Sequence, residues 1–307
     1  MTNRSITRRK LIQLTSGAGA TLGLGWHPLA AQSGEIITKP IPSSGELVPA
    51  IGIGTNRYKI GTPEQNDGLR ATLAAFTEMG GRVVDTAPVY RSSEAILGQL
   101  MAELGNRDQL FIATKIEKQD RKGSLERMEG SLAKLQTSVL DLVQSHQMNG
   151  AENTLPVMRE WQEAGRVRYI GITTSDTDSF PRMLELMNKE PMDFIQVNYS
   201  LSNREAADEI LPLAEDKGIA VLINIPLARG QLFKAVADRQ LPDWTSKFDC
   251  ESWGQFFLKY VISHPAVTCA IPGATKAKHA TDNVGAAYGR LPDSQLRKRQ
   301  EQFFDTL

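Results

Sequence analysis

The sequence is poor in cysteine, with only Cys250 and Cys269 among its 307 residues. Two cysteines cannot build a multiple-disulfide framework, and Cys269, inside the apolar run 267–271, is expected to be a small core residue. The sequence also lacks an excess of either charge, because 35 basic residues balance 35 acidic ones. Without a net field, the whole chain has no electrostatic attraction for nucleic acid or an anionic membrane, although a local basic patch is still allowed.

Long apolar runs and clustered metal ligands are missing as well. After residue 33, no stretch is long and apolar enough to span a bilayer. His146, His264 and His279 lie far apart on different kinds of element, and no serine stands in an obvious nucleophile arrangement with a base. With 41% hydrophobic residues in 307, the chain can bury the core of one barrel-sized domain or two smaller ones.

Residues 1–33 have the composition of an export signal. A basic start is followed by a weakly apolar, Gly/Ala-rich stretch at 11–24 and a small-residue ending at 28–31 that suits signal peptidase. The pair Arg8-Arg9 resembles the twin-arginine export motif, with Leu11 where a phenylalanine is usual. We therefore predict a signal peptide over residues 1–33, the twin-arginine translocase as a partner during export, and a periplasmic protein. A disordered basic tail is the alternative.

Residues 34–307 show the alternation of a single α/β domain. A β-hairpin with strands at 36–41 and 46–50 comes first and would close the bottom of a barrel. Strand-like runs follow at 51–54, 82–86, 110–115, 140–145, 167–173, 194–198, 220–226 and 268–272. Helical segments lie at 63–79, 93–104, 124–135, 155–164, 179–188, 206–217, 250–263 and 275–288, with an extra C-terminal helix at 294–306.

Eight strands, each followed by a helix, predict a (β/α)8 TIM barrel. A doubly wound sheet fits less well, because Gly52 and Gly54 lack the third glycine of a dinucleotide fingerprint. The connection after the seventh strand, residues 228–249, stands out by its length. Structureless loops beyond about 12–15 residues are uncommon and usually functional. We predict that this connection is a lid over a bound ligand, and it carries Arg229, Gly230, Phe233, Trp244 and Phe248.

Three ionisable residues each end a predicted strand, namely Asp85, Lys115 and His146, and Tyr90 follows Asp85 on the next loop. In a parallel barrel the carboxyl ends of the strands share one face, where active sites lie, so these side chains should converge. A lysine beside a tyrosine lowers the tyrosine pKa from about 10, and an aspartate would hold the ammonium in place. A histidine can donate to a carbonyl oxygen. The set predicts a proton donor beside a carbonyl, with a cofactor supplying hydride.

The motifs around these residues resemble those of the aldo-keto reductase superfamily over residues 36–283. This resemblance implies a (β/α)8 barrel that binds NADP(H) without a Rossmann fold and reduces an aldehyde or ketone to an alcohol. It also implies that Tyr90 is the general acid/base, that Lys115 and Asp85 tune it, and that His146 orients the carbonyl. The motifs are Asp85-Thr86-Ala87-Pro88-Val89-Tyr90 with Ser93-Glu94 and Gly98, Ala113-Thr114-Lys115, Asp141-Leu142 before His146, the run 165–171, Gln196-Val197-Asn198-Tyr199 and Ile271-Pro272-Gly273.

The same resemblance implies where the cofactor lies: Gln196 at the nicotinamide carboxamide, Lys276 and His279 at a 2′-phosphate, and Asn283 at the adenine. This chain departs from the family pattern at several of these positions. Thr173-Thr174 replaces Ser-Asn, Asn224 replaces the aromatic that stacks on the nicotinamide, and His279 replaces an arginine. NADPH is the expected cofactor and NADH the alternative. The predicted cofactor positions are Gly54, Thr55, Thr173, Thr174, Gln196, Asn224, Pro226, Leu227, Gly230, Leu232, Ile271, Gly273, Lys276, His279 and Asn283.

Two other functions stay open from the sequence alone. A nucleotide-binding sensor with little turnover would suit the missing aromatic at Asn224, and a lyase or isomerase could use Lys115 as a Schiff base. Arg91, where a glycine is common, either shapes the mouth for an anionic substrate or is simply solvated. Export adds a requirement, because the periplasm is not expected to hold free NADPH. A prebound cofactor with a re-reducing redox partner, or another donor, would be needed.

Overall fold

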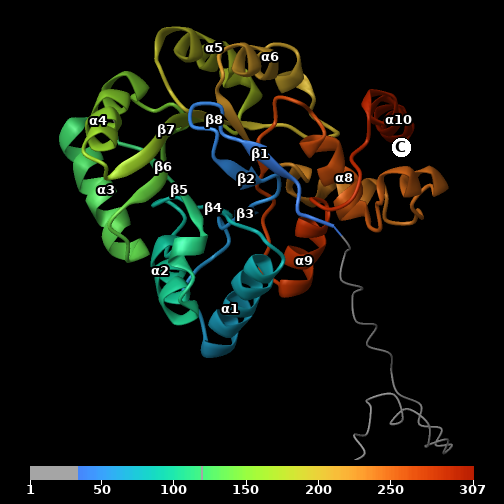
Figure 1. Cartoon of the computed structure of the whole chain (residues 1–307), viewed down its shortest axis with the longest axis horizontal. Helices are drawn as coiled ribbons and strands as arrows, with labels where there is room; N and C mark the ends of the chain where they lie inside the picture. Colours follow the sequence, from blue (N-terminus) through green and yellow to red (C-terminus); the bar gives the residue numbers. More distant parts are fainter. Residues whose placement is uncertain (1–33, 119) are drawn as a thin grey trace, which may run out of the picture. The chain divides into compact units, whose positions relative to one another are not determined.

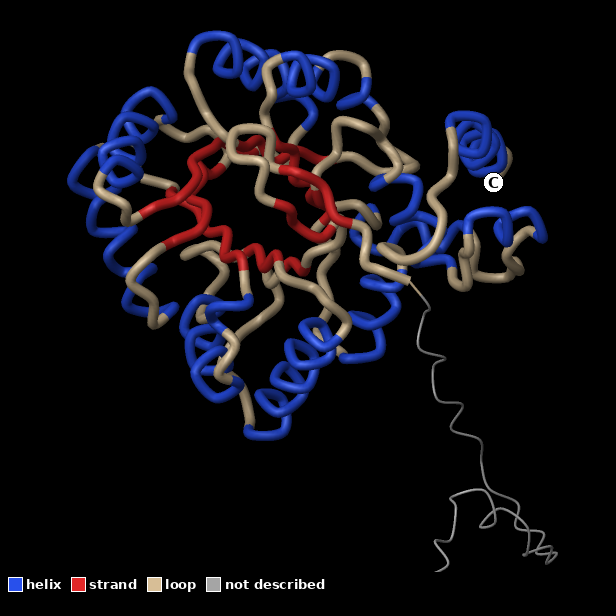
Figure 2. Tube along the Cα trace, viewed as in Figure 1, coloured by secondary structure: helices blue, strands red, loops and turns tan. Residues whose placement is uncertain are grey.

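The computed structural model describes residues 34–118 and 120–307, so the predicted signal peptide lies outside the described residues. In the described part the chain forms an eight-stranded sheet in the order β10-β9-β8-β7-β6-β5-β4-β3. Parallel bridges from Ile51 to Ala270 and from Gly54 to Gly273 join its two ends and close it into a barrel. Figure 2 shows this ring of strands with the helices around it. The fold is the predicted (β/α)8 barrel.

The elements follow one another as alternating strands and helices after an N-terminal hairpin (Figure 1). The hairpin is β1 (Thr38–Pro40) and β2 (Leu47–Pro49), and the barrel strands are β3 (Ile53–Gly54), β4 (Val83–Asp85), β5 (Phe111–Ile116), β6 (Leu140–His146), β7 (Val167–Thr173), β8 (Phe194–Asn198), β9 (Ala220–Asn224) and β10 (Cys269–Ala270). The helices are α1 (Pro63–Glu78), α2 (Ser93–Leu104), α3 (Arg121–Leu135), α4 (Ala151–Glu163), α5 (Phe180–Lys189), α6 (Ile210–Asp216), α7 (Gln231–Ala235), α8 (Trp253–Ile262), α9 (Ala277–Gly285) and α10 (Ser294–Asp305). Among the described residues, no helix is long and apolar enough to cross a membrane.

Several predicted boundaries are wrong, each for a local reason. The strand predicted over 220–226 ends at Asn224, because Ile225 has φ 51° and leaves the extended conformation. The helix predicted from residue 124 begins at Arg121, because the Asp120 carboxylate caps it and accepts from the Gly123 N–H at 2.8 Å. The helix predicted from residue 250 begins at Trp253, after the cap Ser252. The helix predicted from residue 155 begins at Ala151 and holds Pro156 inside.

The long connection 228–249 contains short helices instead of an open loop. Its second half is fixed to the outer helices, because the Trp244 ring lies 5.8 Å from that of Phe256 on α8 and 6.4 Å from that of Phe303 on α10. Phe248 is fully buried in the same cluster. The second half of the connection is therefore part of the packed outer layer, and the lid prediction is wrong for those residues.

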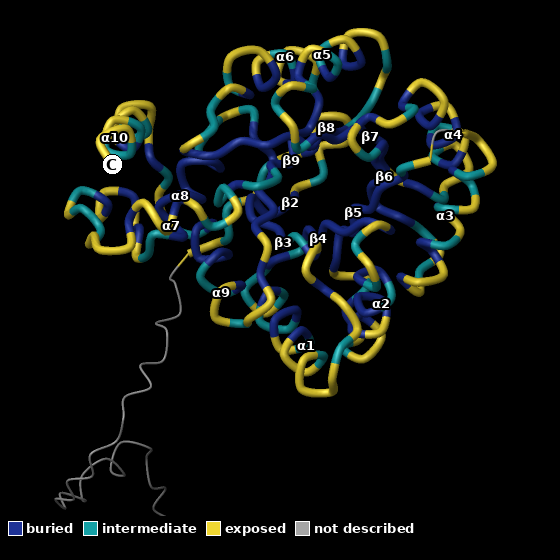
Figure 3. The backbone as a smooth tube through the Cα atoms, turned by 180° about the vertical axis from the view of Figure 1, so that it is seen from behind, coloured by how far each residue is buried: buried dark blue, intermediate teal, exposed yellow. Residues whose placement is uncertain are grey.

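Side chains at every second strand position point into the barrel. Towards the bottom these positions form an apolar layer sealed by Ile41 and Val48 of the hairpin, and Cys269 is part of it as predicted. Further along the same strands the inward positions carry Asp85, Lys115, Gln144, His146, Gln196 and Asn224. Figure 3 shows the strands buried and the outer helix faces exposed. Because alternate residues of each strand point inward, the barrel interior has an apolar layer near the hairpin and a polar layer above it, at the carboxyl ends of the strands.

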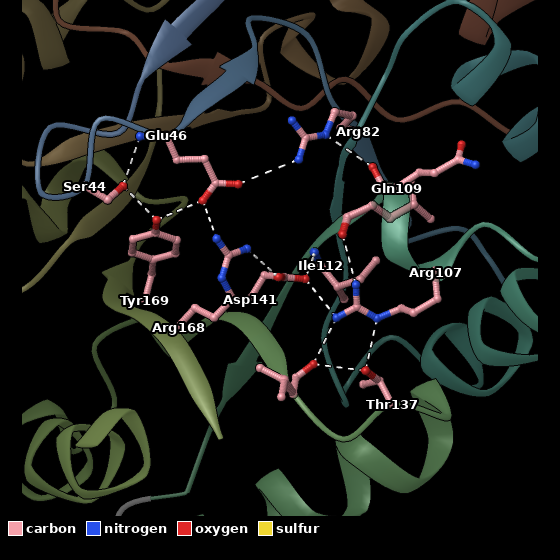
Figure 4. A network of polar contacts seen from close by, with 12 residues as sticks. Ser44, Glu46, Arg82, Arg107, Gln109, Ile112, Thr137, Asp141, Arg168 and Tyr169 are labelled. Atoms are coloured by element: carbon pink, nitrogen blue, oxygen red, sulfur yellow. Dashed lines mark hydrogen bonds and ion pairs between the residues drawn. The ribbon is translucent and has the colours of Figure 1, made fainter. Parts of the chain in front are cut away.

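A network of carboxylates and arginines ties the hairpin to the bottom of the barrel (Figure 4). Asp141, at the start of β6, accepts from Arg107 at 2.9 Å and from Arg168 at 2.8 Å. Its carboxylate also accepts from the Ile112 N–H at 2.8 Å. Arg168 reaches on to Glu46 of the hairpin. The Asp141 of the family motif is thus a structural residue, remote from the strand ends that carry the chemistry.

We expect Asp141→Ala to lower the free energy of unfolding by about 2–4 kcal/mol. The substitution removes the shared acceptor of two arginines and leaves the buried Ile112 N–H without a partner. Urea denaturation measures the loss. Glu129→Ala is the matched control, since it breaks the exposed pair with Arg166 and should change stability little. Equal stability of the two variants would contradict the account of this network.

Candidate active site

A cavity of about 1150 Å³ opens at the carboxyl ends of the strands. All four predicted catalytic residues, Asp85, Tyr90, Lys115 and His146, line it. Single-ligand pockets typically measure roughly 300–1,000 Å³, so this cavity has room for a large ligand with a smaller one beside it. The parallel pairing of β4, β5 and β6 brings the ends of these strands together, as the sequence predicted.

Lys115 and Asp85 form a buried ion pair at the floor of the cavity. The Lys115 ammonium donates to the two Asp85 carboxylate oxygens at 2.7 and 2.8 Å, and to the Thr86 carbonyl at 2.7 Å. Lys115 is 1% exposed and Asp85 is 3% exposed. Burial raises the pKa of Asp85, while Lys115 and the Gln196 side chain oppose that rise. Asp85 therefore fixes the position of the Lys115 ammonium inside the barrel.

Tyr90 lies on the loop after β4, with Lys115 Nζ 5.2 Å from its ring centroid. Burial is the largest influence on the hydroxyl and raises the pKa of Tyr90, Lys115 lowers it, and Asp85 adds to the rise. The sequence predicted a lowered pKa from the lysine alone. That direction is wrong, because desolvation of the buried hydroxyl raises the pKa of Tyr90 more than the ammonium lowers it. Tyr90 is therefore fully protonated at neutral pH, which is the state that a proton donor requires.

The loop that carries Tyr90 is held by the motif residues after it. Ser93 Oγ donates to the Thr55 carbonyl at 3.0 Å and lies 3.0 Å from Thr86 Oγ1. Gly98 lets α2 pack on α3, because a Cβ there would lie 2.0 Å from the Lys134 carbonyl oxygen. Arg91 is exposed and has φ 56°, the left-handed conformation that glycine adopts without strain.

His146 faces Tyr90 across the cavity, with their ring centroids 6.1 Å apart and the planes at 84°. Burial, followed by the charge on Lys115, lowers the pKa of His146 to about 4. The imidazole is therefore neutral at physiological pH. A neutral imidazole carries one N–H, so His146 can donate a single hydrogen bond to a ligand in the cavity.

Comparison with known proteins assigns the chain to a family. A sequence model described as the Aldo/keto reductase family matches residues 50–301. The chain belongs to the aldo/keto reductase family. Family membership makes it an oxidoreductase that reduces carbonyl groups with NAD(P)H, the class predicted from the sequence.

Individual members of the aldo/keto reductase family resemble the chain over different lengths. The aldo-keto reductase YhdN of Bacillus subtilis is 35% identical over 211 residues, an alignment that covers 62% of each protein. The NADH-specific methylglyoxal reductase of Escherichia coli is 25% identical over 321 residues, covering 85% of this chain and 97% of that one. A solved aldo-keto reductase from Klebsiella pneumoniae in complex with NADPH is 24% identical, with a TM-score of 0.71 over 88% of this chain and 96% of that one. The structural likeness supports the fold.

Most of the cofactor positions that the family pattern implied also line the cavity. They follow the carboxyl ends of β3, β7, β8, β9 and β10 and the first turns of α9. Asn224 stands out, because its Oδ1 is buried without a partner among the described residues, while its Nδ2 donates to the Thr174 carbonyl at 2.9 Å. The lining positions are Gly54, Thr55, Thr173, Gln196, Asn224, Pro226, Leu227, Gly230, Ile271, Gly273, Lys276, His279 and Asn283.

Two predicted cofactor positions do not line the cavity. Leu232 is 1% exposed and packs in the core between the strands and the helices, because the short helix α7 turns its side chain inward. Thr174 turns its hydroxyl to Gln147 Oε1 at 3.1 Å. Neither side chain is therefore placed to contact a ligand in the cavity. The Thr174 carbonyl still holds Asn224 by accepting a hydrogen bond from its Nδ2.

The cavity also has walls that the cofactor prediction missed. Arg229 and Phe233 belong to the predicted lid and do line the cavity, unlike Trp244 and Phe248. Positions next to a strand end, such as Gln147, could have been found from that adjacency. The start of α8 and Asp282 of α9 could not, because only tertiary packing brings them to the strand ends. The missed lining residues are Asn56, Arg57, Gln147, Ser175, Ile225, Ser252, Trp253, Gly254, Pro272, Ala274, Thr275 and Asp282.

Proposed function

We propose that this protein reduces a small aldehyde or ketone to an alcohol, with Tyr90 as the proton donor and NADPH as the preferred hydride source. One arrangement carries the proposal. The buried Lys115–Asp85 pair lies under Tyr90, and His146 faces the same tyrosine, all within one cavity. The walls fit a nicotinamide cofactor for two reasons. Asn224 Oδ1 has no partner in the part of the chain that the structure describes and can accept from a ligand N–H, and the cavity exceeds the size of a single small ligand.

Each polar side chain then has a defined task. When bound, the reduced nicotinamide supplies hydride to the carbonyl carbon. Tyr90 gives its hydroxyl proton to the carbonyl oxygen as negative charge develops there. The phenolate that remains faces the Lys115 ammonium, which offsets its charge, and Asp85 holds that ammonium in place. His146, being neutral, donates a hydrogen bond to the same oxygen and fixes its direction before the proton moves.

The exposed end of the cavity favours NADPH over NADH. Lys276 and His279 lie at the start of α9, where the positive end of the helix dipole attracts an anion. Lys276 supplies a full positive charge for a 2′-phosphate, and His279 supplies a weaker contact than an arginine would. Gln196, Asn224 and Asn283 would contact the uncharged parts of the cofactor.

We expect Lys276→Ala to weaken NADPH binding about 10- to 100-fold and to leave NADH binding unchanged. The lysine pairs only with the 2′-phosphate, which NADH lacks. Fluorescence titration with each nucleotide measures the two dissociation constants. Lys278→Ala removes an exposed charge two residues further along α9, outside the cavity lining, and serves as the control. Equal weakening of both nucleotides would place Lys276 elsewhere on the cofactor.

The direct test of the function is titration of the purified protein with NADPH, followed by a panel of aldehydes and ketones. The proposal expects tight nucleotide binding and oxidation of NADPH that depends on the carbonyl compound. Binding without turnover on any member of the panel would point to the nucleotide-binding sensor instead.

We also propose that the protein acts in the periplasm after export by the twin-arginine translocase. The support is the Arg8-Arg9 pair and the composition of residues 1–33, which lie outside the described residues. Because this route carries folded proteins, the cofactor can travel already bound. Repeated turnover there requires a redox partner that re-reduces it. Replacing Arg8 and Arg9 by lysine should retain the protein in the cytoplasm, whereas Arg4→Lys should not. Periplasmic accumulation of the double variant would argue against this route.

A further inference from the structure

Arg57 is a charged residue of the cavity wall that the proposed chemistry does not use. In the part of the chain that the structure describes, no hydrogen bond or ion pair joins its side chain to another residue. Most arginines in the same part of the chain pair with a carboxylate, as Arg204 does with Asp305. The Arg57 guanidinium is therefore free to bind an anionic group of a ligand in the cavity.

The turn that carries Arg57 is fixed at both ends. The Tyr58 N–H donates to the Thr55 carbonyl at 2.8 Å, which makes Asn56 and Arg57 the two central residues of a β-turn. Thr55 is 0% exposed and Tyr58 is 1% exposed, whereas both central residues line the cavity. The backbone of Arg57 thus has a rigid base, so only its side chain has to become ordered when an anion binds.

The same turn is joined to the loop that carries the proton donor. Thr55 Oγ1 donates to the Asp85 carbonyl at 2.9 Å, at the end of β4. Further along, the Ile60 N–H donates to Ser92 Oγ at 2.8 Å, two residues after Tyr90. The loops after β3 and β4 therefore lie side by side. A ligand group bound to the turn would lie on the same side of the cavity as the tyrosine.

The other cations that line the cavity have partners or lie elsewhere. Lys115 is paired with Asp85. Arg229 follows β9 and Lys276 follows β10, at the strand ends where the proposed function puts the cofactor phosphates. Among the described residues, this leaves Arg57 as the unpaired cation of the cavity lining next to the loop that carries the proton donor.

Two further cations surround this part of the cavity mouth. Lys59 and Arg91 are exposed, lie outside the cavity lining and have no side-chain partner in the described part of the chain. Residues 55–62 and 86–92 together hold these two cations and Arg57, and they contain no acidic residue. A local excess of positive charge attracts anions from solution. Arg91 would therefore act on an anionic substrate at long range and not by contact.

We propose that the substrate is an anionic carbonyl compound, an aldehyde or ketone that also carries a carboxylate, and that Arg57 binds this carboxylate. Its reduction rests on the proposed function, in which Tyr90 and His146 act on the carbonyl oxygen of the same molecule. A guanidinium can hold a carboxylate by two parallel N–H···O bonds. One guanidinium balances one negative charge, so a carboxylate fits this position better than a doubly charged phosphate.

The kinetic test uses a series of aldehydes that carry a terminal carboxylate at increasing distance from the carbonyl, each paired with its methyl ester. With NADPH as donor, the wild-type full chain should show a higher kcat/KM for the acid than for the ester at one chain length. Arg57→Gln should lower this acid-to-ester ratio about 10- to 100-fold, the usual value of a charge-assisted hydrogen bond. Arg57→Lys should retain part of the ratio, because it keeps the charge and loses the fork.

Arg239→Gln is the matched control. Arg239 is also exposed and has no side-chain partner in the described part of the chain, but it does not line the cavity. This variant should keep the wild-type ratio. A wild-type protein without preference for any of the acids, or an unchanged ratio in Arg57→Gln, would overturn the proposal. So would weaker NADPH binding in Arg57→Gln by fluorescence titration, because that result would place Arg57 on a cofactor phosphate.

A second readout needs no turnover and so separates the carboxylate site from the reductase function. The full chain is titrated in a calorimeter with pentanoate or with pentanamide, in the presence of NADPH. Wild type should bind pentanoate more tightly than pentanamide, and Arg57→Gln should lose this preference. Equal binding of the two compounds by wild type would reject the carboxylate site even if the protein proves to be a reductase. An Arg57-dependent preference in a protein without turnover would retain the site and reject the reductase function.

Discussion

Tyr90→Phe is expected to lower kcat for carbonyl reduction by about 10²- to 10⁴-fold, the usual contribution of a general acid. The substitution removes one oxygen and keeps the ring, so its edge-on contact with His146 and the contact with Lys115 persist. Because the lost group acts on the substrate oxygen, the affinity for NADPH should stay as in wild type. Steady-state kinetics together with a fluorescence titration of NADPH separate the two effects.

Tyr58→Phe provides a matched control for this result. Tyr58 is 1% exposed, its hydroxyl is buried without a partner among the described residues, and it does not line the cavity. Its loss should leave kcat unchanged and should not reduce stability, because an unsatisfied group disappears. If Tyr90→Phe retained the activity of Tyr58→Phe, another group would have to supply the proton.

Lys115→Met is expected to affect both catalysis and folding. Without the ammonium, the phenolate left on Tyr90 has no opposite charge beside it, so kcat should fall by about 10²-fold or more. Asp85 is left buried without its ionic partner, and removing one member of a buried pair typically costs about 3–5 kcal/mol. In this variant the pKa of Asp85 rises further above its unfolded value. The stability loss relative to wild type is therefore smallest at acidic pH, where Asp85 is protonated in both proteins. It grows as the pH rises from the folded pKa of Asp85 in wild type to the higher folded pKa in the variant, and it is constant above that pH.

The double variant Lys115→Met/Asp85→Leu distinguishes these two consequences. It removes both charges, so we expect urea denaturation to show that much of the lost stability returns and that its pH dependence disappears. Activity should not return, because the missing ammonium is still needed beside Tyr90. A double variant as unstable as Lys115→Met would show that packing of the lysine stem, and not the unpaired carboxylate, dominates the loss.

Much of the fold could be predicted because the strands of a parallel barrel leave a regular trace in the sequence. Asp85, Lys115 and His146 each close an apolar run, and parallel pairing then places them on one face. Element ends were harder, because they depend on single residues. Ile225 leaves the extended conformation one residue after Asn224, and Asp120 starts its helix earlier than the apolar pattern suggests.

Sequence reasoning could name single residues of the site. It could not predict properties that depend on several side chains packed together, such as a pKa or a hydrogen bond between distant residues. Tyr90 was predicted as the proton donor from its motif, but the direction of its pKa shift depends on how far burial outweighs Lys115, which only the three-dimensional environment fixes. The contact of Gln144 could not be predicted, because Gln144 lies within an apolar run and its hydrogen-bond partner, Gln196, is 52 positions away in the sequence. Leu232 fitted the loop pattern and yet faces the core.

Transfer of an isotopic label tests the central claim most directly. The purified protein is incubated with NADPH carrying deuterium at C4 of the nicotinamide and with an aldehyde that it turns over. Mass spectrometry of the alcohol should find one deuterium on the carbon that was the carbonyl carbon, and the amount of labelled alcohol should collapse in Tyr90→Phe. Alcohol without deuterium, or labelled alcohol formed equally well by Tyr90→Phe, would contradict hydride transfer completed by the Tyr90 proton.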